Sequence, residues 1–185
     1  MQYTLIKPLA SPRYTAVARG FHWLLGLLLL GSFCFGIYMA DLPFSPARIK
    51  LFNWHKWAGI TILALSSLRL LWRLTHTPPA PPPMPTWQQS VFRGTHLLMY
   101  ILFFAIPLVG WAYSSATGFQ VVYFGVLPLP DWVGKDADLA KQLKTLHGLL
   151  AYALASLVVL HVAAALKHQF IDKDSLLTRM KPFDH

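Results

Sequence analysis

The sequence predicts an all-α membrane protein, built as a bundle of four transmembrane helices. Hydrophobic residues make up 55% of the 185 residues and charged residues only 12%, a composition outside the usual range of soluble domains. Apolar runs long enough to cross a bilayer as one helix occur four times. Basic residues stand at the ends of these runs instead of forming a stripe, which is typical of membrane topology and not of a nucleic-acid-binding surface.

The first two expected spans each carry a histidine near the start. Residues 21–40 read FHWLLGLLLLGSFCFGIYMA, where His22 stands beside Trp23, a residue type common at the membrane interface. After a proline-containing turn, residues 53–74 form the second expected span, with His55 close to its beginning. Each run has the length of about 20 residues that a bilayer requires.

A proline-rich connector and a long loop flank the third expected span. The connector reads THTPPAPPPMP, which cannot be helical and is expected to run extended on the surface. The third span covers residues 92–113, with His96 near its start and Pro107 as the expected site of a kink. A surface loop at residues 114–143 leads to the fourth span, and residues 1–185 together are expected to form a single domain.

The distribution of lysine and arginine predicts the orientation. Four spans place both termini on the same side of the membrane, together with the proline-rich connector. That side carries ten of the sixteen basic residues, and cytoplasmic segments are enriched in such residues. We therefore expect a multi-pass membrane protein with both termini in the cytoplasm.

The fourth expected span, residues 144–167, carries two histidines on one face. It reads KTLHGLLAYALASLVVLHVAAALK, with His147 and His161 fourteen residues apart. At about 100° per residue both imidazoles point to nearly the same side, and at about 1.5 Å per residue they are roughly 21 Å apart along the axis. One histidine therefore lies in each leaflet, where an ionisable side chain is costly and normally has a partner.

The topology sorts the histidines into two pairs by depth, because alternate spans enter from opposite sides. His22 matches His161 on the cytoplasmic side, and His55 matches His147 on the outer side. Each pair comes from two different helices, as two axial ligands of a haem b in a helical bundle do. Zinc is less favoured because neither pair is joined by the cysteine or carboxylate that zinc usually adds. The single cysteine and the lack of a CxxCH motif make the haem non-covalent.

Several stretches resemble the bacterial cytochrome b561 family over nearly the whole chain. They are FHWLLG, NWHKWAGI, the run RLLWRL before the connector, LHGLLAY and LHVAAALKHQF. The resemblance implies an inner-membrane protein with two b haems, whose axial ligands are His22, His55, His147 and His161. It also implies an oxidoreductase of the superoxide oxidase type, which takes electrons from superoxide at the periplasmic face and passes them to ubiquinone.

Two further residues are candidates for the inner site. Arg69 follows His55 by fourteen residues, so it lies at the depth of the inner haem and could pair with a haem propionate or a quinone oxygen. The alternative is an arginine that snorkels to the interface, which we expect for Arg73. His168 follows His161 by seven residues and is a candidate to bind the quinone and carry its proton, or else an exposed interfacial histidine.

Other polar and aromatic residues are expected to have ordinary roles. His96 could join the inner site, but an ordinary interfacial histidine is the favoured interpretation. The remaining histidines, His76 and His185, fall in the connector and the tail and are expected at the surface. Three aromatic residues are expected to pack or to anchor the interface, namely Trp23, Tyr100 and Trp111.

Lys56 and Lys144 are candidates to steer an anionic donor. Lys56 adjoins His55, and Lys144 precedes His147 by three residues. Positive charge at a haem edge would attract a small anion such as superoxide. Three nearby aspartates offset this charge, so an ordinary solvated loop is the alternative.

The sequence is also compatible with two other functions. The chain could be a cytochrome b relay subunit that passes electrons between the quinone pool and a partner dehydrogenase or another redox protein. A small transporter whose membrane histidines relay protons belongs to a different class and predicts no haem.

Overall fold

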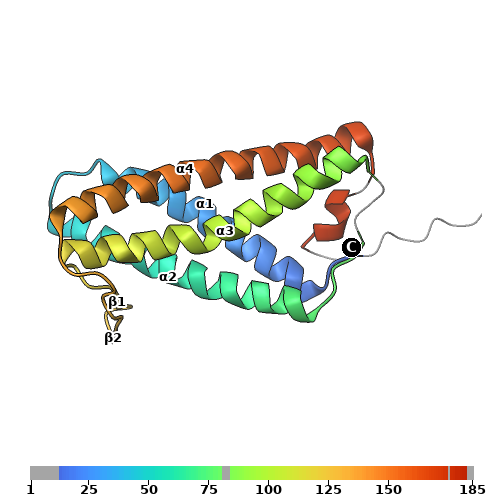
Figure 1. Ribbon diagram of the computed structural model, residues 1–185. Coiled ribbons are helices and arrows are strands. Elements are labelled where there is room, and N and C mark those ends of the chain that lie inside the picture. Colours follow the sequence, from blue (N-terminus) through green and yellow to red (C-terminus); the bar gives the residue numbers. More distant parts are fainter. Residues whose placement is uncertain (1–12, 81–83, 175, 183–185) are drawn as a thin grey trace, which may run out of the picture.

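The computed structural model describes residues 13–80, 84–174 and 176–182. Four long helices dominate this part of the chain: α1 (Ala16–Ala40), α2 (Pro46–Thr75), α3 (Thr86–Thr117) and α4 (Ala137–Lys167). Each contains a stretch long and apolar enough to cross a membrane by length and composition. The predicted all-α bundle of four membrane helices is confirmed (Figure 1).

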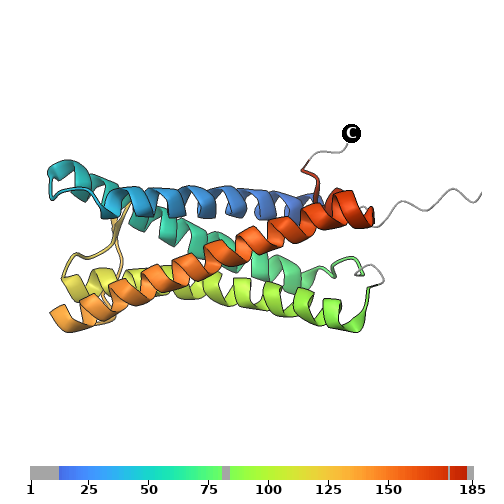
Figure 2. The ribbon, with the colours of Figure 1, turned by 90° about the horizontal axis from the view of Figure 1, so that it is seen from above.

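The four helices lie side by side and alternate in direction, as Figures 1 and 2 show. The most extensive packing joins α3 to α4 and α1 to α2, whereas α1 and α4 meet at few positions. We call the end where α1 and α3 begin the terminal end, because the described part of the chain begins and ends there. The opposite end, where α2 and α4 begin, is the loop end.

The helices are longer than the expected spans because polar capping residues start them outside the apolar runs. Ser45 precedes Pro46, and its hydroxyl accepts a hydrogen bond from the amide of Arg48 at 3.2 Å. Asp136 accepts one from the amide of Leu139 at 2.9 Å and starts α4 at Ala137. The turn before α2 and the loop before α4 are therefore shorter than the sequence predicts.

The loop between α3 and α4 contains a small hairpin. Strand β1 (Val122–Tyr123) pairs antiparallel with β2 (Leu127–Pro128), with Tyr123 opposite Leu127. The turn places Phe124 at φ 50° and Gly125 at φ 74°, both in the left-handed region. The loop is thus an ordered element that emerges directly from α3.

The C-terminal segment folds back onto the start of α1. A π-helical turn, η1 (His168–Asp172), ends α4, and the short 3₁₀ helix η2 (Leu176–Met180) returns beneath it. The indole of Trp23 donates a hydrogen bond to the Met180 carbonyl at 2.7 Å, and Arg19 donates one to the Lys181 carbonyl at 2.9 Å. The sequence predicted only a polar tail in this place.

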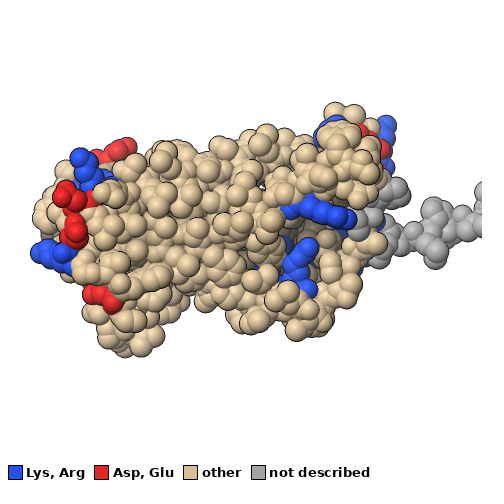
Figure 3. Space-filling model, viewed as in Figure 1, with Lys and Arg blue, Asp and Glu red and all other residues tan. Residues whose placement is uncertain are grey.

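Charged side chains gather at the two ends of the bundle. Figure 3 shows both basic and acidic residues at each end of the bundle and a largely tan surface between them. Large apolar side chains such as Leu27, Leu71 and Val159 are exposed along this middle part. The bundle therefore presents an apolar belt with charged rims, the surface that a bilayer-spanning protein needs.

Candidate functional site

All four helices repeat one spacing toward the interior of the bundle. On each helix two notable positions lie fourteen residues apart: His22 and Gly36 on α1, His55 and Arg69 on α2, His96 and Gly110 on α3, and His147 and His161 on α4. Fourteen residues make nearly four whole turns, so both members of each set face the same side. The bundle therefore has two levels, a loop-end level and a terminal-end level, about 21 Å apart along α4.

At the loop-end level the rings of His55 and His147 have centroids 6.2 Å apart. The Nδ1 of His147 lies 3.0 Å from the carbonyl oxygen of Ile106 and can donate a hydrogen bond to it. The Nδ1 of His55 lies 3.4 Å from the hydroxyl of Ser32. For His147, an Nδ1–H bonded to a carbonyl fixes the tautomer and leaves Nε2 available as a ligand. The Ser32 hydroxyl can donate to Nδ1 of His55 or accept from it.

Two glycines lie directly against these imidazoles. A Cβ atom at Gly110 would lie 2.9 Å from Cε1 of His147, and one at Gly36 would lie 3.2 Å from Cε1 of His55. Both imidazoles therefore occupy space that the side chain of any larger residue at Gly36 or Gly110 would need. Sequence reasoning missed these glycines, because their fourteen-residue distance from His22 and His96 does not show what they face across the bundle.

At the terminal-end level the rings of His22 and His161 also have centroids 6.2 Å apart. A third histidine, His96, has its ring centroid 5.3 Å from that of His161. Its Nδ1 lies 2.7 Å from the carbonyl oxygen of Phe92, one turn earlier on α3. This level therefore holds three imidazoles, where the sequence favoured an ordinary interfacial role for His96.

The spacing of both pairs fits two axial ligands on one metal. A bond from a metal to an imidazole nitrogen is about 2 Å long, so two rings on opposite sides of one metal have centroids roughly 6 Å apart. Both pairs show 6.2 Å, and each pair joins two different helices. Two imidazoles at this separation could hold the iron of a flat macrocycle between them.

An apolar layer separates the two levels. Leu154 lies on α4 halfway between His147 and His161, and it forms a buried cluster with Met99 and Leu102 of α3. Leu29 of α1 packs against this cluster. The levels are thus two sites in one bundle and not a single large cavity.

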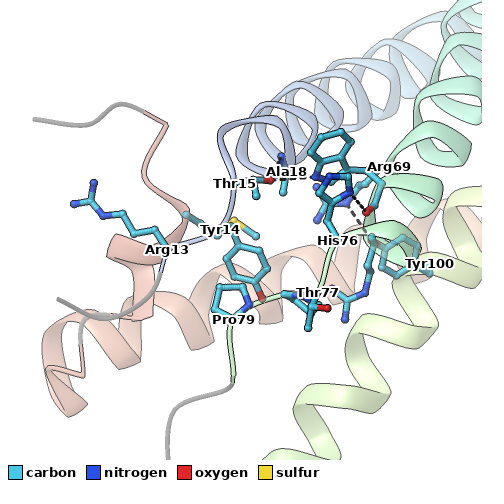
Figure 4. Close-up of a pocket in the computed structure, with 13 residues that line it drawn as sticks. Arg13, Tyr14, Thr15, Ala18, Arg69, His76, Thr77, Pro79 and Tyr100 are labelled. Carbon is cyan, nitrogen blue, oxygen red and sulfur yellow. Dashed lines mark hydrogen bonds between the residues drawn. The ribbon is translucent and has the colours of Figure 1, made fainter. Parts of the chain in front are cut away.

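A pocket of about 290 Å³ opens at the terminal end, between α1, α2 and α3 (Figure 4). Arg69 lines it and donates a hydrogen bond from Nε to the hydroxyl of Tyr100 at 3.2 Å. The Nη1 of Arg69 is buried and has no hydrogen-bond partner among the described residues. A buried guanidinium nitrogen without a partner is costly, and an anionic oxygen in the pocket would satisfy it.

A second pocket of about 450 Å³ lies between α2 and α3 at the same end. It shares Arg73 and Tyr100 with the first pocket and is also lined by His96. The guanidinium of Arg73 lies 6.0 Å from the centroid of the Tyr100 ring. Tyr100 and Arg73 therefore line pockets beside the terminal-end level. The sequence predicted that Tyr100 packs or anchors the interface and that Arg73 snorkels to the interface.

His168 lies outside both pockets. Its Nδ1 is 2.6 Å from a carboxylate oxygen of Asp174 and 3.2 Å from one of Asp172, and its Nε2 is 3.3 Å from Nε2 of Gln88. The side chain is 14% exposed. A contact between His168 and a quinone therefore stays a prediction.

The remaining candidates occupy the two rims. Lys56 donates a hydrogen bond from Nζ to the Phe119 carbonyl at 3.0 Å, and Lys144 is exposed. His76 is exposed, as expected, but its ring also stacks on Trp72 with centroids 3.6 Å apart and lines the first pocket. His185 lies outside the described residues.

A bundle of four apolar helices with these interior histidines has the architecture of a membrane cytochrome b. Residues 13–183 match the family model described as prokaryotic cytochrome b561. The chain belongs to this family, as the sequence stretches had indicated. Family membership implies a b-type haem and places the protein among electron-transferring membrane proteins.

Three curated relatives span nearly the whole chain. Cytochrome b561 homolog 2 of Escherichia coli K12 is 35% identical over 170 residues, which cover 91% of this chain and 90% of the relative. The probable superoxide oxidase CybB of Yersinia pestis is 34% identical over 173 residues, with coverage of 92% and 96%. Cytochrome b562 of Cereibacter sphaeroides is 27% identical over 92% of this chain and 96% of its own length.

Proposed function

We propose that the protein carries single electrons across the bacterial inner membrane through two non-covalent b haems. In this proposal His55 and His147 are the axial ligands at the loop-end level, and His22 and His161 are those at the terminal-end level. The observation that carries the proposal is the matched 6.2 Å separation of both imidazole pairs. Haem, when bound, supplies a reversible one-electron couple.

The chain's own residues hold, orient and insulate the two sites. The Ile106 carbonyl would hold the proton of His147 on Nδ1 and leave its Nε2 free to bind iron, and the Ser32 hydroxyl would help to orient the His55 ring. Leu154 and its apolar neighbours exclude water between the levels. Arg69 is proposed to neutralise a propionate or a quinone oxygen with its buried, unpartnered Nη1.

We propose superoxide as the electron donor, taken up at the loop end. The support is the similarity to a protein named a probable superoxide oxidase, together with the basic residues near His55 and His147. Lys56 and Lys144 would steer the anion toward the haem edge. The hydrogen bond from Lys56 to the Phe119 carbonyl holds its ammonium group beside the loop-end level.

A membrane quinone, ubiquinone in the first instance, is the proposed acceptor at the terminal end. The pocket lined by Arg69 and Tyr100 supports this assignment, because it offers polar donors beside the terminal-end level. His168 is the proposed proton carrier, with Asp172 and Asp174 within hydrogen-bond distance of its Nδ1. Quinone reduction takes two electrons and two protons. The electrons would come from the donor at the loop end through the haems, and the protons from the cytoplasm.

A visible spectrum of the purified protein tests the haem assignment. We expect Soret and α bands with two haems per chain, and we expect His147→Ala and His161→Ala each to remove one of them. Absence of these bands would falsify the haem assignment. Loss of both haems in each single variant would contradict two separate sites.

Haem reduction by a superoxide-generating system, with and without added ubiquinone, tests the donor and the acceptor. We expect reduction fast enough to compete with spontaneous dismutation, followed by reoxidation when quinone is present. Reduction slower than dismutation would overturn the oxidase role and favour a relay between the quinone pool and a partner protein.

A further inference from the structure

The hairpin between α3 and α4 exposes an apolar surface, which we call the apolar hairpin (residues 119–128). Val126 is 80% exposed, and three further side chains are more than half exposed, namely Phe119, Phe124 and Leu127. The sequence has no charged residue between Arg93 on α3 and Asp131, which follows the hairpin. The chain therefore carries no formally charged side chain from the first part of α3 through this loop.

The apolar hairpin lies beside the bundle instead of extending beyond its end. The indole of Trp57 on α2 donates a hydrogen bond to the Val122 carbonyl at 2.7 Å. The hydroxyl of Tyr123 lies 2.9 Å from that of Thr61, six residues past His55 and so about 9 Å further toward the terminal end. Figure 1 shows the hairpin projecting sideways from the bundle next to the first half of α2.

The hairpin is held in a fixed position against this helix. The ring centroids of Phe124 and Trp57 are 5.2 Å apart. Phe124 adopts φ 50°, a conformation that is uncommon for a bulky residue and that needs support from its surroundings. Its contact with Trp57 supplies that support, so the apolar side chains are presented from a defined loop.

The backbone of the hairpin is largely satisfied by its own hydrogen bonds. The amides of Gly125, Val126 and Leu129 bond to the carbonyls of Val122, Tyr123 and Val121, at 3.1, 3.1 and 2.8 Å. The amide of the Gln120 side chain bonds to the Leu129 carbonyl. Because its backbone groups are paired in this way, the hairpin can lie out of bulk water at low cost. The unpaired backbone groups at the edges of a two-stranded sheet would still be costly in the hydrocarbon centre.

We propose that the apolar hairpin lies in the membrane interface of the leaflet at the loop end, with lipid as its partner. Its exposed side chains are continuous with the apolar belt of the four helices, and its contacts run along α2 at and below the loop-end level. Apolar groups in this zone are buried about 5–10 Å, at the boundary of headgroups and acyl chains. The hairpin thereby anchors Trp57, two residues from His55, to the lipid surface.

Depth-dependent quenching of a fluorophore tests this placement. Cys34→Ser removes the single cysteine, and Val126→Cys introduces one at the hairpin tip for labelling with an environment-sensitive dye. The protein is reconstituted in phosphatidylethanolamine–phosphatidylglycerol vesicles that carry nitroxide lipids labelled near the headgroup or deep in the acyl chain. We expect blue-shifted emission, several-fold stronger quenching by the shallow nitroxide than by aqueous iodide, and weaker quenching by the deep one.

Two control positions bracket the result. A cysteine at Asp138, exposed in the first turn of α4, reports the aqueous rim, and one at Val159, 67% exposed in mid-helix, reports the acyl region. Leu127→Cys provides a second hairpin site if the Val126 variant does not fold. Emission and iodide quenching equal to those at Asp138 would overturn the proposal, as expected for a surface that docks a partner protein. Quenching strongest by the deep nitroxide would overturn the interfacial depth.

Discussion

Gly36 and Gly110 occupy positions where a methyl group would meet an imidazole. The Cβ of an alanine would lie 3.2 Å from the ring of His55 in the first case and 2.9 Å from that of His147 in the second. Neither glycine adopts a positive φ, so the requirement is for space and not for backbone freedom. At the loop-end level the small residues of α1 and α3 therefore determine where the ligands of α2 and α4 can lie.

Gly110→Ala is expected to weaken the loop-end site and leave the terminal-end site intact. The new Cβ would displace the His147 ring from its position, although alanine favours a helix over glycine by about 1 kcal/mol. Haem content per chain and a redox titration of both components measure the effect. Gly26→Ala on α1 is the control, because a Cβ there meets no described atom within 4 Å. Equal haem content in both variants would contradict the argument.

Arg69→Leu is expected to lower the reduction potential of the terminal-end haem by on the order of 50 mV. A nearby positive charge favours the reduced form, and about 59 mV corresponds to a tenfold change in a one-electron equilibrium. Arg69→Lys retains the charge and should recover part of the shift. The loop-end haem serves as an internal reference in the same titration. Equal shifts in both haems would contradict a local effect of Arg69.

The four histidines could be chosen from the sequence, but the glycines that face two of them could not. A histidine inside an apolar run is conspicuous because burial of an ionisable group is costly. A glycine in such a run carries no comparable signal, since nothing in its own neighbourhood shows what it faces across the bundle. The sequence also does not show that His96 lies near His161, because this proximity depends on how α3 packs against α4.

Among the elements, the apolar part of each helix was predictable and the ends were not. Hydropathy locates the stretch inside the bilayer, whereas Pro46 to Phe52 is helical because of a cap and a proline at the first position. The sequence does not predict the hairpin, because its turn places phenylalanine, and not the usual asparagine, in the left-handed region before Gly125. The C-terminal segment folds back through hydrogen bonds to the backbone carbonyls of Met180 and Lys181. Every residue has such a carbonyl, so the sequence does not predict these contacts.

A chain that ends at Asp174 is expected to lose haem from the terminal-end level and keep it at the loop end. The deletion removes the carbonyls of Met180 and Lys181, which hold Trp23 and Arg19 on either side of His22. Haem content and the two-component redox titration report the loss. Trp23→Phe removes only the indole donor and should show a smaller effect in the same direction. Unchanged haem content and potentials in the shortened chain would show that the tail does not support this site.

For the whole molecule, we expect the terminal end to face the cytoplasm. In the sequence, the segments at this end carry ten of the sixteen basic residues and three of the seven aspartates, so their net positive charge exceeds that of the loop-end segments. Green fluorescent protein fused after His185 should fluoresce, because it matures in the cytoplasm, and alkaline phosphatase fused there should be inactive. Alkaline phosphatase fused after Gly134 should be active, since that position belongs to the loop end. The reverse pattern would invert the proposed direction of electron flow.

Both histidine pairs depend on α4, and this has a consequence for the order of biosynthesis. His22 and His55 leave the ribosome early, on α1 and α2, but each has its partner on the last long helix. Neither pair can form until α4 has entered the membrane, and the carbonyls beside His22 arrive only with the final residues of the chain. With the proposed ligand set, cofactor insertion would be the closing step of assembly, and a nascent chain with three helices would be a precursor without haem.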